Sequence, residues 1–121
     1  RERLPGRSPF LRSSARMEDT AWDTVGRLVE WLDTESGVSP DLARVLRVLK
    51  ITEEAGEVAE AIHGVSGSNP RKGNSHTWQD VEKELCDVIL TSMVALKTIT
   101  PDADKVFAER LAHVAERSLS G

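Results

Sequence analysis

The stretch DVEKELCDVILTSMVALK, residues 80–97, decides the fold class because it is apolar on almost every side of a helix. No charged residue occurs between Asp87 and Lys97. The alternating pattern of a half-buried strand is absent, and a helix that is apolar nearly all round is typical of burial on most sides. We therefore predict a long buried helix over residues 78–98.

Three further helices are predicted from apolar residues at helical spacing and from turn signals. They cover residues 18–35, 40–63 and 101–118. Ser39, Thr77 and Thr100 are the expected N-caps of the last three helices, and Gly64 is the expected stop of the second. Glu82 does not occupy the third helical position after Thr77, so no capping box is predicted there.

The predicted fold class is all-α, a four-helix bundle completed by oligomerisation. A chain of 121 residues suggests one domain with a modest core. Few helices are then available to cover residues 78–98, so a homodimer or tetramer is expected. Short connections favour antiparallel neighbours.

The composition of the chain limits the classes of partner and the compartment that we expect. A net charge of −4 and only 4% aromatic residues disfavour a nucleic-acid partner. No apolar run is long enough to predict a membrane span. The one cysteine, Cys86, cannot form an internal disulfide, which fits a reducing compartment, and we expect a cytoplasmic protein.

Residues 1–16 differ from the rest in charge, with five arginines and one glutamate, a formal charge of +4. We predict either that Met17 is the natural start or that residues 1–16 are a flexible basic leader, with the functional domain over residues 17–121. A basic arm that binds phosphate polymers is the alternative.

The stretch KITEEAGEVAEA, residues 50–61, is the acidic counterpart of residues 80–97. An apolar seam at coiled-coil spacing runs along this helix, and its glutamates lie largely opposite that seam. The seam residues are Val48, Ile51, Ala55, Val58 and Ile62. On this helix alone, the glutamates are explained equally well as a solvated face.

Two acidic residues of the predicted helix at residues 78–98 favour a metal site over a solvated face. Glu84 and Asp87 share the apolar surface of residues 78–98, and a buried ionised carboxylate is costly unless it is paired or binds a metal. Lys83 points elsewhere on the helical wheel, so we do not expect it to serve both carboxylates. Glu54 and Glu57 have the same i, i+3 spacing, and antiparallel packing would bring the four carboxylates together.

An all-oxygen cluster of this kind suits Mg²⁺ or Mn²⁺ rather than Zn²⁺, which prefers Cys and His. Cationic side chains would still be needed for an anionic substrate. Lys50 lies one turn before the glutamates, and Arg71 and Lys72 lie in the Gly/Asn-rich loop at residues 64–76. A solvated loop, and a simple helical ion pair of Lys50 with Glu54, are the alternatives for these residues.

The pair of motifs EEAGE, residues 53–57, and ELCD, residues 84–87, resembles the EExxE…ExxD signature of MazG-like nucleoside triphosphate pyrophosphohydrolases. That family belongs to the all-α NTP pyrophosphatase superfamily. The resemblance covers roughly residues 42–96, including the preceding KIT and the loop SGSNPRKGNSH. It is more specific than EExxE alone, because acidic helices are common.

The resemblance implies hydrolysis of a nucleoside triphosphate to a monophosphate and pyrophosphate. Glu54, Glu57, Glu84 and Asp87 would be the Mg²⁺ ligands. Glu53 would position or deprotonate the attacking water, or bind a further metal ion. Two alternatives stay open. One is a non-catalytic helical interaction or regulatory module on the same scaffold, and the other is a phosphoribosyl-ATP pyrophosphohydrolase.

Overall fold

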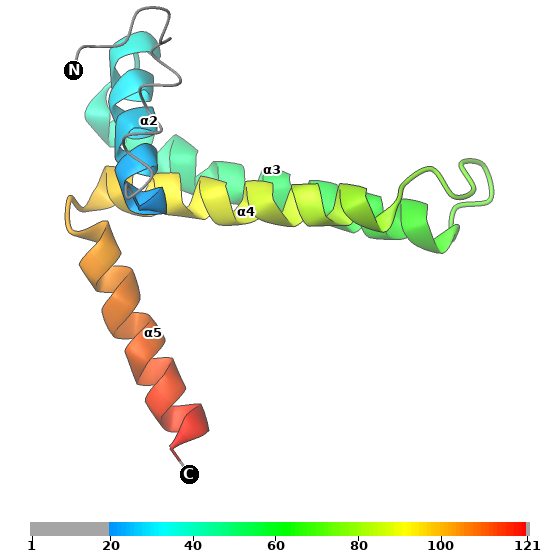
Figure 1. The fold of residues 1–121 in the computed structure, drawn as a ribbon. Helices are drawn as coiled ribbons and strands as arrows, with labels where there is room; N and C mark the ends of the chain where they lie inside the picture. The colour runs from blue at the N-terminus through cyan, green and yellow to red at the C-terminus, as the bar shows by residue number, and fades with distance from the viewer. Residues whose placement is uncertain (1–19, 121) are drawn as a thin grey trace, which may run out of the picture.

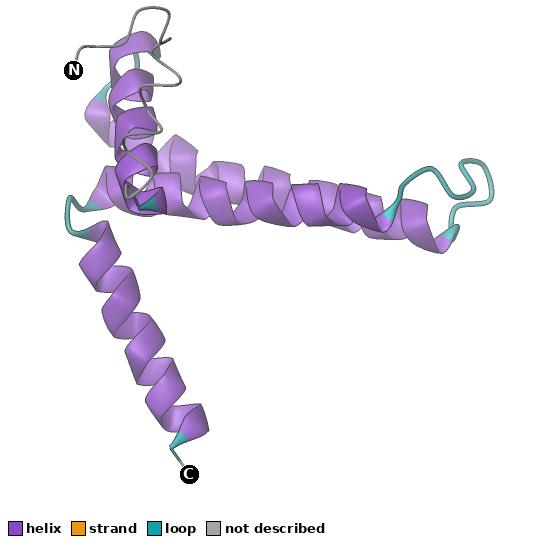
Figure 2. Ribbon diagram, in the orientation of Figure 1, coloured by secondary structure: helices purple, strands orange, loops and turns teal. Residues whose placement is uncertain are grey.

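The computed structural model describes residues 20–120, which form helices only, with no strand in that range. The helices are α2 (Ala21–Glu35), α3 (Pro40–Ser66), α4 (Trp78–Ile99) and α5 (Ala103–Leu119) (Figures 1 and 2). The predicted all-α class is therefore confirmed. The predicted leader, residues 1–16, and the predicted start at Met17 lie outside the described residues.

Side-chain caps fix where the first three helices begin. The Thr20 hydroxyl accepts from the Asp23 backbone N–H, so α2 begins later than the predicted residue 18. The predicted cap of α3 is confirmed, since the Ser39 hydroxyl accepts from the Leu42 N–H. The predicted cap Thr77 is confirmed as well, but the predicted lack of a capping box is wrong. Asp80 takes the place of the usual Glu or Gln and accepts from the Thr77 N–H at 2.9 Å.

Two predicted helix ends are also wrong. Helix α3 continues past Gly64 and ends at Gly67, whose φ of 67° is the left-handed conformation that glycine adopts without strain. Thr100 does not cap α5. It is the extended C-cap of α4, and its hydroxyl accepts from the N–H of Asp102, the residue that precedes α5.

Helices α3 and α4 run antiparallel side by side and share the most extensive contact in the fold (Figure 1). Small residues are buried on both helices, which is compatible with close approach of the backbones: Ala43 and Ala61 on α3, and Ala95 on α4. At helical spacing Ala43 and Ala61 share a stripe with Glu54. Helix α3 therefore turns Glu54 toward α4, whereas Glu53, Glu57 and Glu60 are exposed.

The apolar seam predicted on α3 is only partly buried in this chain, since Ile51 and Val58 are half-buried whereas Val48, Ala55 and Ile62 are exposed. Val48 and Ile62 are 43% and 39% exposed. Helix α4 is likewise less covered than predicted, since Leu85, Ile89 and Leu90 are all exposed. The expectation that α4 is buried on most sides is thus wrong for the single chain, because α3 and α2 cover only part of its circumference.

Helices α2 and α5 both lie at the end of the α3–α4 pair that is far from the loop joining α3 to α4 (Figure 1). Helix α2 packs on α4 and buries Val25 and Val29. The Arg47 guanidinium, 9% exposed, ties the three helices together by donating to Asp33 of α2 at 2.8 Å and to Thr98 of α4 at 3.1 Å.

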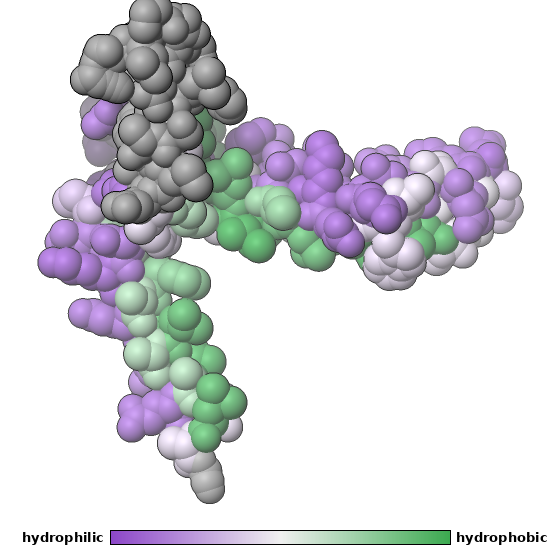
Figure 3. Space-filling model, in the orientation of Figure 1, coloured by the Kyte–Doolittle hydropathy of each residue, from purple (hydrophilic) through white to green (hydrophobic). Residues whose placement is uncertain are grey.

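Helix α5 extends away from the α3–α4 pair and carries apolar side chains along one side (Figures 1 and 3). Its aromatic residue Phe107 contacts Trp22 of α2, with ring centroids 6.2 Å apart. Most of its apolar side is exposed to solvent: Val106, Phe107, Leu111 and Val114. No helix within residues 20–120 combines the length and apolar character that crossing a membrane requires.

The loop between α3 and α4 is held against α3 at two glycines. A Cβ on Gly64 would lie 2.0 Å from Nδ1 of His76, and a Cβ on Gly67 would lie 2.4 Å from the side-chain oxygen of Asn74. The Asn74 amide in turn donates to the Val65 carbonyl at 3.1 Å. The loop can therefore approach α3 closely only because Gly64 and Gly67 have no side chain.

Replacing each of two helical glycines by alanine should therefore give opposite results. Gly64→Ala should lower the free energy of unfolding by about 1–3 kcal/mol, because the new methyl group overlaps the His76 ring. Gly56→Ala has no atom within 4 Å of its new Cβ and should raise that free energy by about 0.5–1 kcal/mol through helix propensity. Urea unfolding followed by circular dichroism measures both. Stabilisation by Gly64→Ala would contradict the packing described.

Candidate metal and phosphate site

Three carboxylates meet where α3 and α4 face one another. One oxygen from each of Glu54, Glu84 and Asp87 lies within 4.8 Å of the other two. Helical spacing explains the arrangement, since Glu84 and Asp87 are one turn apart on α4 and Glu54 faces them from α3. The side chains of Glu54 and Glu84 are only 13% and 18% exposed, so water screens their mutual repulsion incompletely.

The hydrogen-bonding capacity of the Glu84 carboxylate is not fully satisfied by the described protein groups. Its Oε1 atom is buried and has no hydrogen-bond partner among residues 20–120. An unpaired buried carboxylate oxygen carries a desolvation cost that a bound cation would remove. An oxygen-only set of donors fits Mg²⁺ or Mn²⁺, so the residues present suit the divalent metal expected from the sequence.

Glu57 lies beside the cluster, and the negative charge of the cluster acts on its carboxyl group. The negative charges of Glu54 and then Glu84 raise the pKa of the Glu57 carboxyl above its ordinary value of 4.5. Glu57 is solvent-exposed, and it does not belong to the set of three whose oxygens lie within 4.8 Å. The structure thus brings together three of the four predicted ligands closely and places the fourth next to them.

Two lysines neutralise part of this negative charge. Lys50 Nζ lies 3.5 Å from Glu54 and 3.8 Å from Glu53. The predicted proximity of Lys50 to the glutamates is confirmed. Glu53 itself is 72% exposed, so its carboxylate lies at the open edge of the cluster.

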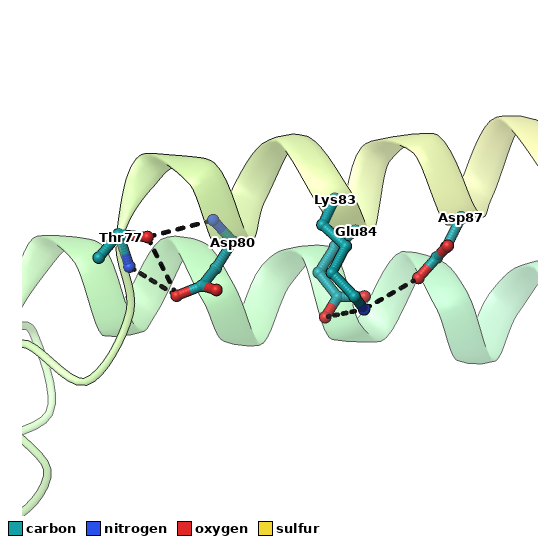
Figure 4. Close-up of polar contacts among 5 residues, drawn as sticks. All are labelled: Thr77, Asp80, Lys83, Glu84 and Asp87. Atoms are coloured by element: carbon teal, nitrogen blue, oxygen red, sulfur yellow. Dashed lines mark hydrogen bonds and ion pairs between the residues drawn. The ribbon is translucent and has the colours of Figure 1, made fainter.

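The expectation that Lys83 does not serve both carboxylates is wrong. Its Nζ lies 3.5 Å from Asp87 and 3.9 Å from Glu84, between the two carboxylates (Figure 4). The helical wheel places the Lys83 Cα direction correctly, but four methylenes let the ammonium group swing across to both acids. Glu84 and then Asp87 raise the pKa of the Lys83 ammonium group.

A cavity of about 910 Å³ adjoins the cluster on the side of the loop between α3 and α4. Glu53, Glu57 and Glu60 line its α3 wall, and Lys72 enters from the loop, with its Nζ 3.8 Å from Glu60. The predicted cation Lys72 therefore faces the acidic helix.

Other loop residues shape the same cavity, whereas Arg71 does not line it. The Arg71 backbone N–H donates to the Asn69 side chain at 2.9 Å, and the residue is exposed. His63 Nδ1 lies 2.9 Å from the Ser68 hydroxyl, and both residues line the cavity. Glu60 belongs to neither motif, but it lies one turn after Glu57, and this spacing indicates that it shares the cavity wall.

Comparison with known proteins identifies a family. The family model of the MazG nucleotide pyrophosphohydrolase domain matches residues 46–118, more than half of the chain. No curated protein and no solved structure matches the chain. The matched segment begins in the first half of α3 and contains both motif stretches, the loop and most of α5.

The raised pKa of Glu57 predicts how the metal-free protein responds to pH. A carboxyl whose pKa is higher in the folded state stabilises the fold fully below pH 4.5, and that contribution is lost as pH rises through the raised native pKa. The contribution of Asp80 to stability changes over a different pH range. Its pKa is lowered by the Thr77 backbone N–H and hydroxyl, so its contribution is present above pH 3.8 and lost as pH falls.

Unfolding with a chelator present should therefore show a decline in stability as pH rises above 4.5, and Glu57→Gln should flatten that decline. Urea titrations at half-unit pH steps measure the effect. Saturating Mg²⁺ should also remove the decline, because cation binding replaces the proton. An identical pH profile for the variant and the parent protein would contradict the electrostatic account of Glu57.

Proposed function

Because the chain belongs to the MazG nucleotide pyrophosphohydrolase family, we propose that it hydrolyses a nucleoside triphosphate, or a related nucleotide, with the help of Mg²⁺. The oxygen of water would bond to the α-phosphorus while the bond to the bridging oxygen of the β-phosphate breaks. The products are a nucleoside monophosphate and pyrophosphate. The convergence of Glu54, Glu84 and Asp87, with an unpaired buried oxygen on Glu84, is the observation that carries this proposal.

We assign the metal-binding role to Glu54, Glu57, Glu84 and Asp87. Their oxygen donors suit Mg²⁺, with Mn²⁺ as a substitute. When bound, the ion neutralises the acidic site for a polyanionic substrate and lowers the pKa of water. The charges of Glu54 and Glu84 that raise the pKa of Glu57 are the charges that a bound cation would neutralise.

Glu53 is proposed to orient the attacking water and accept its proton. Its exposed carboxylate lies at the edge of the cluster and lines the neighbouring cavity, where a water molecule has access. A general base must lie within hydrogen-bond reach of the proton it removes. Glu53 is therefore better placed for that role than Glu84, whose side chain is largely buried.

The phosphates are proposed to bind Lys50, Arg71 and Lys72. Lys72 already enters the cavity beside the acids. Lys50 is paired with Glu53 and Glu54, and cation binding to the acids leaves its ammonium group available to phosphate oxygens. Arg71 is exposed in the same loop, two residues after Asn69, and would need to turn its side chain toward the cavity.

A homodimer or tetramer is the assembly that best explains the apolar surface. The uncovered side of α5 carries exposed apolar side chains (Figure 3), and Val45, Val48 and Leu49 of α3 are exposed as well. A second copy of the chain would bury such side chains. Isolated exposed apolar residues are ordinary, but contiguous apolar faces mark interaction surfaces. The net charge of −4 speaks against a nucleic-acid partner, and the single cysteine suits a cytoplasmic protein.

Pyrophosphate release over a panel of nucleotides with Mg²⁺ tests the activity. Glu54→Gln and Asp87→Asn should each lower turnover more than about 100-fold, because each removes a charged metal ligand. Glu30→Gln, an exposed change on α2, is the matched control and should leave turnover unchanged. Full activity in both site variants would rule out the metal-site assignment, and no turnover of any nucleotide by the parent chain would favour a non-catalytic interaction module.

A substitution on the exposed apolar side of α5 tests the proposed oligomeric state. Leu111→Glu places a charge on the exposed apolar side, where Leu111 is 56% exposed. The molar mass measured by light scattering should fall from that of a dimer or tetramer toward that of one chain. Ala112→Glu puts the same charge on the opposite side of the helix and should leave the mass unchanged. A monomeric parent protein would contradict the proposed assembly.

A further inference from the structure

A second hollow lies at the α2 end of the site, on the far side of the carboxylates from the loop. It is a groove of about 360 Å³ between α2, α3 and α4. Its walls are mainly apolar and include Leu28, Trp31 and Leu32 of α2, Leu46 of α3, and Leu90 and Val94 of α4. Nothing in the proposed hydrolysis uses these side chains.

The groove is continuous with the acidic cluster. Lys50 lines the groove and also pairs with Glu54, so one side chain belongs to both regions. On α4, Leu90 lies one turn after Asp87 and therefore on the same side of the helix. A ligand that touches the carboxylates through a cation is thus within one helical turn of the apolar walls.

Three regions therefore follow one another along α3: the apolar groove, the carboxylates and the cavity entered by Lys72. The visible surface follows the same order. Apolar side chains gather near α2 and α5, whereas hydrophilic ones predominate along the rest of the α3–α4 pair toward the loop (Figure 3). A nucleotide has the matching sequence of an apolar planar base, a reacting phosphate and an anionic end.

We propose that this groove, lined by residues of α2, α3 and α4, binds the nucleoside part of the substrate. The base then lies toward α2 and the leaving pyrophosphate toward the loop at residues 67–77. This inference rests on the proposed function, because it takes the phosphates to bind at the carboxylates. It adds the direction of the substrate along α3 and the means by which its base is recognised.

The groove offers few polar groups with which to read the edge of a base. Arg47 lines it, but its guanidinium already donates to Asp33 and Thr98. Lys50 is paired with acids, which leaves mainly the hydroxyl groups of Ser36 and Thr91. Apolar contact discriminates weakly between ligands of similar size, whereas a site built for hydrogen bonding discriminates strongly. Uridine and cytidine triphosphates, whose bases have the same size, should therefore bind within about tenfold of one another.

Calorimetric titration with Mg²⁺ separates the groove from the phosphate site. The probes are an α,β-methylene nucleoside triphosphate, which resists hydrolysis, and imidodiphosphate, which has no nucleoside. Leu46→Gln keeps the side-chain size and makes the groove wall polar. It should weaken binding of the nucleotide about tenfold and change binding of imidodiphosphate less than about twofold.

Leu49→Gln is the matched control on the same helix. Leu49 is 58% exposed, against 45% for Leu46, and lies in a different hollow with Val45 and Ile99. Its nucleotide affinity should stay within about twofold of the parent value. Because both leucines are exposed, neither variant should lose the fold, and Leu28→Gln on the α2 wall provides a second test of the groove.

Each other outcome overturns the assignment. Equal nucleotide affinity in Leu46→Gln, Leu28→Gln and the parent chain excludes the groove. A change in molar mass with unchanged nucleotide affinity assigns the groove to a second copy of the chain. If the parent chain binds nucleotide but these variants do not weaken it, only the groove fails. If the parent chain binds neither nucleotide nor imidodiphosphate with Mg²⁺, the proposed function fails and the groove assignment with it.

Discussion

Negative charge enclosed between two packed helices is the constraint on which the rest of this structure depends. Glu54 and Glu84 have little contact with solvent, and one oxygen of Glu84 has no partner within the described chain. Carboxylates held this close repel one another, and their repulsion is weakly screened where water is excluded. Lys50 and Lys83 reduce the repulsion from the rim, but neither reaches the unpaired buried oxygen.

Placing acids at the centre of the α3–α4 contact dictates how the remaining residues are distributed. The contact is closed above and below the acids by small residues such as Ala61 and Ala95, which allow close approach without supplying much apolar area. The large apolar side chains are displaced to the outer surfaces of α3, α4 and α5. The same distribution that encloses the acids therefore leaves apolar faces exposed, which is the basis of the proposed assembly.

Much of this arrangement could be predicted from the sequence. Two i, i+3 pairs of acids on antiparallel helices suffice to predict that Glu54, Glu84 and Asp87 meet, since helical spacing is rigid. The side of α3 that faces α4 could not be predicted in the same way, because the apolar seam is the more hydrophobic side, yet Val48, Ala55 and Ile62 on it are exposed. Apolar periodicity shows which side is buried only when the chain buries it alone.

Side-chain reach and loop geometry also escaped prediction. Helical spacing gives only the direction of the Lys83 Cα–Cβ bond, and its flexible side chain reaches well beyond that direction. A glycine after an apolar run is typical of a helix end, whereas Gly64 lies inside α3, where its missing side chain leaves room for the His76 ring. The apolar groove is formed by three helices at once, so no single stretch of sequence indicates it.

The most direct test of the central claim is the thermal stability of Glu84→Gln, measured with a chelator and with Mg²⁺. Removing the charge whose oxygen is buried and unpaired should raise the melting temperature of the metal-free protein, because the repulsion between the carboxylates decreases. The same change should abolish most of the increase that Mg²⁺ gives the parent protein. A lower metal-free melting temperature, together with an undiminished response to Mg²⁺, would contradict the account.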